Sequence, residues 1–144
     1  MVNSISNTVN ISMPTKDRNY CQFDGVKVLY YLSKKEEALP LLDKTLKSTN
    51  DEKEVCESLY IADRLIENGV KGVDKMYPTF ARFNDTKSPN IQTFLAGVYR
   101  KTKVPDAFGP LCKMLIQNSI NPPKEPQLFD PNEEIGGAIL DYLV

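Results

Sequence analysis

The feature that most constrains the fold is the stretch of residues 51–83, in which two amphipathic segments flank the dipeptide Asn68-Gly69. In the first segment, apolar side chains recur every three to four residues, which is typical of a helix with one buried face. These side chains are Val55, Leu59, Ala62, Leu65 and Ile66. Asn50 or Asp51 can cap the start of this helix, and Gly69 can adopt the left-handed conformation that ends it.

The second segment repeats the pattern and predicts a helix that returns antiparallel to the first. Its apolar positions are Val70, Val73, Met76 or Tyr77, Phe80 and Phe83. Pro78 interrupts it, because an interior proline removes a backbone donor and clashes with the carbonyl four residues earlier. We therefore expect a helical hairpin whose second helix is kinked at Pro78.

The bulk composition favours one globular domain. A length of 144 residues and a hydrophobic content of 41% allow a substantial core. The formal net charge of -1 gives no electrostatic basis for binding nucleic acid or an anionic membrane, whose binders carry a marked basic excess. No apolar run approaches the roughly 20 residues that cross a bilayer. The N-terminus lacks the basic start and apolar core of a secretory signal. We expect a cytoplasmic protein.

The chain contains three cysteines, Cys21, Cys56 and Cys112, and no histidine. An odd number of widely spaced cysteines disfavours a disulfide framework and fits a reducing cytoplasm. Without histidine there is no Ser-His-Asp triad, no Cys-His dyad and no HExxH zinc site. We accordingly predict no catalytic residue, no metal and no cofactor.

A further hairpin is predicted in residues 23–49. Asp24 can cap its first helix, residues 33–37 form a polar turn, and Pro40 falls in the first turn of the second helix, where a missing amide costs little. The apolar positions are Val26, Leu29, Tyr30 and Leu32 in the first helix and Ala38, Leu41, Leu42 and Leu46 in the second.

A third hairpin is predicted in residues 88–118. Ser88 can cap a helix with Pro89 at its first position, and the chain restarts into another helix after Pro105. The apolar positions are Ile91, Phe94, Leu95 and Val98 in the first helix and Phe108, Leu111, Cys112, Leu115 and Ile116 in the second.

The two ends of the chain differ from this pattern. Residues 1–22 are rich in Ser, Asn and Thr and predict a flexible tail. The alternation in residues 8–13 would suit a strand if another segment offered an edge. The proline-rich residues 119–130 predict a stiff connector, and an Asp-Pro pair then opens a last helix in residues 131–144. Its apolar positions are Ile135, Ile139, Tyr142 and Leu143.

The hairpins repeat one another. Placing Pro40, Pro78 and Pro110 in register gives periods of 38 and 32 residues, close to those of helical-pair arrays. The segments EEALPLLDKTL and DAFGPLCKML resemble the Ala-Val-Pro-x-Leu pattern in the second helix of HEAT repeats, and ESLYIADRLIENG resembles the Ala-rich first helix. The resemblance covers residues 24–118, although the aspartate and arginine pair of that family is not repeated. It implies an all-α fold, a short right-handed α-solenoid of about three HEAT-like hairpins in residues 23–118 with a C-terminal capping helix.

The resemblance also implies a contact surface. In HEAT-like arrays the second helices line the concave face, so their outward polar side chains become candidates for binding a protein or peptide. The predicted protein-binding residues are Asp43, Lys44, Lys47, Lys75, Thr79, Arg82, Lys113 and Gln117. This set is mildly basic, whereas residues 51–67 carry an acidic excess, and we therefore expect an acidic partner. An ordinary solvated face is the alternative interpretation.

Several carboxylates lie close together in sequence, notably Asp51, Glu52, Glu54 and Glu57. A general acid/base pair needs carboxylates in environments that split their pKa values, and the pattern here predicts a solvated helix face instead. The last two cysteines lie on or beside apolar faces and predict core packing rather than nucleophilic chemistry.

Two other functions remain open. Some HEAT-like families are lyases or base-excising glycosylases, so the resemblance also allows a HEAT-like lyase or another enzyme accessory. The last helix is also a candidate docking element for another subunit. Truncation at Pro122 separates the two roles of that helix, because unfolding indicates a cap and a folded monomer that loses its partner indicates a docking helix.

Overall fold

The structure is a computed structural model that describes residues 8–9, 23–124 and 130–144. The described chain is largely helical, which confirms the all-α prediction. Two short strands, β1 (Thr8–Val9) and β2 (Phe23–Asp24), pair antiparallel with Val9 opposite Phe23. β1 thus falls at the start of the alternating stretch in which a strand was considered. The rest of the predicted tail and Cys21 lie outside the described residues.

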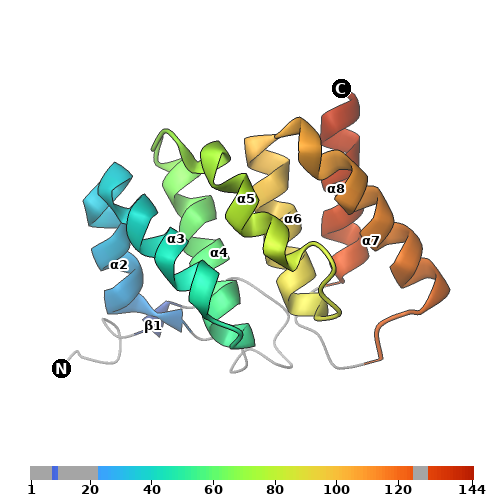
Figure 1. Cartoon of the computed structure of the whole chain (residues 1–144), viewed down its shortest axis with the longest axis horizontal. Helices are drawn as coiled ribbons and strands as arrows, with labels where there is room; N and C mark the ends of the chain where they lie inside the picture. Colours follow the sequence, from blue (N-terminus) through green and yellow to red (C-terminus); the bar gives the residue numbers. More distant parts are fainter. Residues whose placement is uncertain (1–7, 10–22, 125–129) are drawn as a thin grey trace.

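The helices form two layers. The back layer consists of α2 (Gly25–Lys34), α4 (Glu52–Glu67), α6 (Pro89–Thr102) and α8 (Pro131–Leu143). The front layer consists of α3 (Ala38–Ser48), α5 (Tyr77–Phe80) and α7 (Phe108–Ile120). Figure 1 shows the front layer lying across the back layer, with the chain passing from one to the other in each hairpin. Within the back layer, α4 packs against α2 and α6, and α6 packs against α8.

The predicted helix starts are confirmed by their caps. Asp24 accepts the Val26 amide at 3.0 Å, and Asp51 accepts the Glu54 amide at 2.9 Å. Caps at Ser88 and Asp130 begin α6 and α8 in the same way, each with a proline at the next position. Such side-chain acceptors satisfy amides that have no partner in the first turn of a helix.

The second helix of the central hairpin is broken more severely than a kink. Residues 73–83 form a 3-10 turn η3 (Val73–Met76), the short α5, and a second 3-10 turn η4 (Ala81–Phe83). A 3-10 turn also leads into α3, as η2 (Lys35–Glu37), and into α7, as η5 (Pro105–Ala107). Each front helix therefore starts from a 3-10 turn and carries a proline within its first turn.

The core lies between the layers, and the predicted apolar faces of α2 and α7 are only partly correct. In α2 the buried side is formed by Gly25 and Val28, and Leu32 packs against the core as predicted, while Val26, Leu29 and Tyr30 are exposed. In α7 the predicted Leu111 is buried and Leu115 packs against the core, while the predicted Ile116 is exposed. Leu41 and Leu143, also predicted to be apolar contacts, are exposed as well. These end helices carry apolar residues on two sides, so periodicity alone does not tell which side meets the core.

The segment between α7 and α8 is shorter than predicted, because α7 continues to Ile120. Residues 125–129 of the expected connector lie outside the described residues. Among the helices that the structure describes, none combines the length and apolar character needed to cross a membrane.

Candidate functional site

Four of the predicted binding residues gather between α3 and the segment of α5 and η4. Asp43 pairs with Lys47 at 2.7 Å and accepts a hydrogen bond from the Thr79 hydroxyl, and these two bonds lower the pKa of the Asp43 carboxyl. Arg82 donates to the backbone carbonyl of Leu46. Thr79 is only 4% exposed, in contrast to the outward position predicted for it. These side chains therefore join one front helix to the next.

Lys44 and Lys75 are exposed on the surface. Neither lies in the groove formed by the remaining two predicted residues. The structure thus divides the predicted surface into an internal bridge, two separate lysines and one open site.

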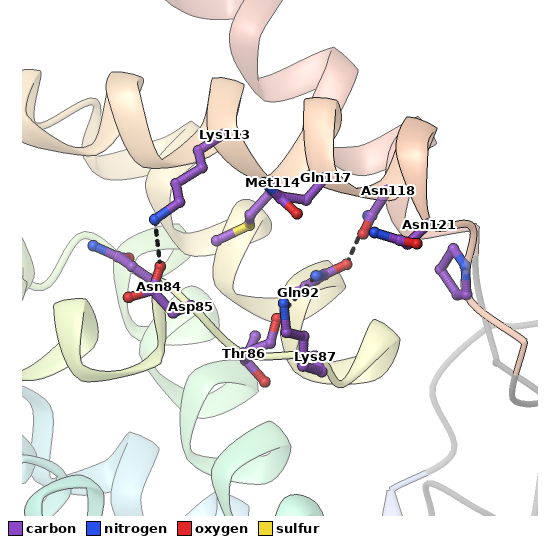
Figure 2. Close-up of a pocket in the computed structure, with 11 residues that line it drawn as sticks. Asn84, Asp85, Thr86, Lys87, Gln92, Lys113, Met114, Gln117, Asn118 and Asn121 are labelled. Atoms are coloured by element: carbon purple, nitrogen blue, oxygen red, sulfur yellow. Dashed lines mark hydrogen bonds and ion pairs between the residues drawn. The ribbon is translucent and has the colours of Figure 1, made fainter.

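Lys113 and Gln117 line a groove of about 430 Å³ between α7 and the loop that follows η4. Its side chains come from this loop, from the start of α6, and from α7 and the residues just after it (Figure 2). The lining residues are Asn84, Asp85, Thr86, Lys87, Gln92, Lys113, Met114, Gln117, Asn118, Asn121 and Pro123. Most of these residues are polar, and five of them carry a side-chain amide.

The floor of the groove is a network of buried amides. Asn118 donates from Nδ2 to Gln92 Oε1 at 2.8 Å and to Asn132 Oδ1 at 2.9 Å. Gln92 in turn donates from Nε2 to the carbonyl of Thr86 at 3.1 Å. The network connects α7, α8, α6 and the loop, so that the floor is held from four sides.

The loop wall is fixed by Asn84. Its Oδ1 accepts the Tyr99 hydroxyl at 2.6 Å, and its Nδ2 donates to the Tyr77 hydroxyl at 3.3 Å. Burial raises the pKa of Tyr99, so its phenol stays protonated and keeps donating. Asp85 and Lys113 then bridge the opening at 3.1 Å, as the dashed line in Figure 2 shows.

This arrangement suits recognition of a peptide backbone. Amide side chains both donate and accept, and therefore match the alternating N–H and C=O groups of an extended chain. The ion pair of Lys113 and Asp85 is highly exposed, and such pairs contribute little to stability. The Lys113 ammonium can therefore exchange Asp85 for a carboxylate on a bound chain at small cost.

The prediction of a solvated carboxylate face on α4 is wrong for Glu57. Glu57 is 6% exposed, pairs with Lys27 of α2 at 2.8 Å, and accepts the amide of Asp24 at 3.0 Å. Glu52 accepts the Ser88 hydroxyl at 2.6 Å at the start of α6. These carboxylates hold neighbouring helices together, and a sequence pattern does not show the partners that bury them.

Asp63 lines a second cavity, of about 240 Å³, between α4, α6 and the start of α8. Burial raises the pKa of the Asp63 carboxyl, and the hydrogen bond from Lys101 Nζ at 2.6 Å opposes that rise.

In the part of the chain that the structure describes, no group of three or more Cys, Asp or Glu side chains is placed to hold a metal ion.

Two of the predicted residues, Lys113 and Gln117, lie along the groove, whereas the residues of its floor were not predicted. Gln92 and Asn118 are polar, so they were not assigned to a buried stripe, although both lie on one. Gln92 shares a face of α6 with Ala96 and Tyr99, and Asn118 follows Leu111 and Met114 at helical spacing. An amide that continues an apolar stripe is the signal that would have found them.

The described residues thus form an all-α protein of two helical layers with an amide-lined polar groove. Comparison with protein-family models, with curated proteins and with solved structures finds no match for this chain. The function is therefore inferred from the geometry of the groove.

Proposed function

We propose that the protein is a non-enzymatic binding scaffold whose groove takes an extended segment of an acidic protein or peptide. The observation that carries the proposal is the amide-lined groove with Lys113 and Gln117 at its rim. Its floor is held by the hydrogen bonds of Gln92 and Asn118, so little ordering is needed when a ligand binds.

The two layers are, in this proposal, a short right-handed HEAT-like solenoid of three hairpins, capped by α8 and located in the cytoplasm. The recurring 3-10 turn before α3, α5 and α7 supports the repeat. The contacts of α4 with α2 and α6, and of α6 with α8, support a stacked array. The odd number of widely spaced cysteines suits a reducing compartment.

Side chains of different chemical character line the groove. Gln117 and Asn121 are exposed and can bond to backbone groups, while Met114 offers an apolar contact at 3% exposure. Lys113 and Lys87 place two ammonium groups on the two walls. This combination of amide, apolar and ammonium groups best fits an extended peptide segment that carries a carboxylate side chain.

Peptides selected from a random displayed library against the full chain test the proposal. We expect acidic sequences, whose affinity falls on the order of tenfold in Lys113→Glu and in Gln117→Ala. Lys75→Glu is the matched control, because it makes the same charge reversal outside the groove. Equal losses in Lys113→Glu and Lys75→Glu, or unchanged affinity in both groove variants, would contradict the proposal.

A further inference from the structure

We infer that the chain assembles with copies of itself head to tail, with α8 of one copy packing against α2 of the next. The first observation is where apolar side chains remain exposed. Among the described residues, the large exposed apolar side chains all lie on the first hairpin, on α7, or from α8 to the chain end: Val26, Leu29, Tyr30, Leu41, Ile116, Ile120, Leu140, Leu143 and Val144. The middle helices α4, α5 and α6 expose none of this kind.

Six of these side chains form one stripe at each end of the back layer, on α2 and from α8 to Val144, whereas Leu41, Ile116 and Ile120 lie on the front layer. On α2 the head face consists of Val26, Leu29, Tyr30 and Lys34, which recur at helical spacing. The Lys34 ammonium lies 5.2 Å from the centre of the Tyr30 ring, so the charge belongs to the same face. At the other end, the tail face consists of Glu133, Gly136, Leu140, Leu143 and Val144. Helical arrays normally place polar outer faces at their ends, and this one does not.

The second observation is that charge alternates along the back layer. α2 carries two lysines and no acidic residue, and α6 carries Arg100 and Lys101 and no acidic residue. α4 carries five acidic and two basic residues, and α8 carries three acidic and no basic residues. The order from α2 to α8 is therefore basic, acidic, basic, acidic.

Each contact within the layer uses this alternation. Lys27 of α2 pairs with α4, and Lys101 of α6 pairs with Asp63 of α4 at 2.6 Å. Arg100 of α6 pairs with Asp141 of α8 at 2.6 Å and with Glu134 at 3.5 Å. A helix that packs against the outer side of α8 would continue this alternation if it were basic. The basic helix α2 of a second copy meets that requirement. An α2–α2 or α8–α8 contact would instead bring like charges together.

Gly136 gives further support. A Cβ at this position would meet nothing within 4 Å, whereas at Gly137 it would lie 2.9 Å from the guanidinium of Arg100. Packing against Arg100 inside the chain explains why position 137 is glycine. No such contact explains Gly136, even though glycine in a helix interior is destabilising relative to alanine. Its place on the tail face allows another helix to approach closely. Such a heterologous contact leaves free ends and permits chains of copies.

Sedimentation velocity of the full chain, from micromolar to near-millimolar concentration, tests the inference. We expect the average mass to rise with concentration and to fall when salt is added, since salt screens exposed charges. Leu29→Asp alters the head face and Leu140→Asp the tail face, and these side chains are 62% and 64% exposed, so both variants should fold. Circular dichroism checks this, and Lys75→Glu serves as a control that should associate like wild type.

Mixing the two variants gives the decisive result. Each alone should be monomeric, with self-association weakened on the order of tenfold or more. The mixture should form a heterodimer and nothing larger, because one intact tail meets one intact head. A monomeric wild type at every concentration, a mixture that stays monomeric, or a homodimer retained by either single variant would overturn the inference.

Discussion

The back and front layers of the molecule are built from the same hairpins but are held together differently. In the back layer, three pairs of neighbouring helices are each joined by at least one ion pair, from Lys27 to Glu57, from Lys101 to Asp63, and from Arg100 to Asp141. In the front layer, α3 and α5 are joined by the Thr79 and Arg82 bonds, and an open groove lies beside α7. The difference indicates that the back layer fixes the shape of the molecule while the front layer leaves a polar surface accessible.

The largest expected effect comes from the part of the core to which the back layer contributes. Leu95 on α6 is fully buried, so Leu95→Ala removes apolar contacts and leaves a cavity. We expect it to lower the free energy of unfolding by about 3 kcal/mol in urea denaturation. Gln117→Ala in the groove is the control, with a change below about 0.5 kcal/mol. Similar losses of unfolding free energy in Leu95→Ala and Gln117→Ala would contradict the expected difference between the buried core and the groove.

The ion pair between α2 and α4 should have the next largest effect. Glu57→Ala leaves the Lys27 ammonium and the Asp24 amide without their acceptor, and we expect a loss of about 2 kcal/mol in the free energy of unfolding. Glu54→Ala, one turn earlier on the same helix and more exposed, should cost clearly less. If the two variants unfold at the same urea concentration, Glu57 does not join these helices as described.

The contact of α8 with the segment that follows α6 should depend on Tyr142. Its hydroxyl donates to the Val104 carbonyl at 2.7 Å, so Tyr142→Phe should lower the free energy of unfolding by about 1 kcal/mol at neutral pH. Thermal unfolding followed by circular dichroism measures this change. A variant as stable as wild type would show that this bond contributes nothing to holding α8.

The raised pKa of Tyr142 predicts that the folded protein loses stability at alkaline pH. Burial raises the pKa of Tyr142 to about 12, so the folded protein holds this proton more tightly than the unfolded chain. The folded state then binds more protons between pH 10.0 and about 12, and stability falls as the pH rises through that window. Tyr142→Phe should make the fall shallower. Unfolding curves measured at several alkaline pH values test it, and equal slopes in both proteins would contradict it.

The smallest effect is expected at the rim of the groove. Lys113→Ala breaks only the exposed pair with Asp85, so the free energy of unfolding should change by less than about 0.5 kcal/mol. Peptide binding should fall in the same variant, measured by fluorescence anisotropy with a selected peptide. A variant that loses both stability and binding would make Lys113 part of the scaffold rather than of the site.

Sequence reasoning was most successful where local chemistry decides the structure. The caps Asp24, Asp51, Ser88 and Asp130 are local signals, since each bonds to amides two or three residues later, and all four predicted helix starts are confirmed. The five apolar positions predicted on α4 also pack into the core, although α4 is central and buries further residues such as Glu57 and Ile61 on its other sides.

It was least successful where a partner distant in sequence decides the outcome. Glu57 accepts the amide of Asp24, which lies 33 residues earlier at the start of α2, and nothing in the sequence near Glu57 indicates this contact. The predicted apolar faces of α2 and α7 were only partly correct, because both helices carry apolar residues on two sides. The floor of the groove depends on Asn118 meeting Gln92 from another helix, a contact that only the packed structure shows.

Chemical-shift mapping of the isotope-labelled full chain, titrated with a selected acidic peptide, locates the binding site. If the peptide occupies the groove, perturbed backbone amides cluster at residues 84–87 and 113–121, with little change in α2 and α4. Perturbations centred on Lys44 and Lys75, or spread along the back layer with the groove unchanged, would contradict the claim that the front-layer groove is the binding site.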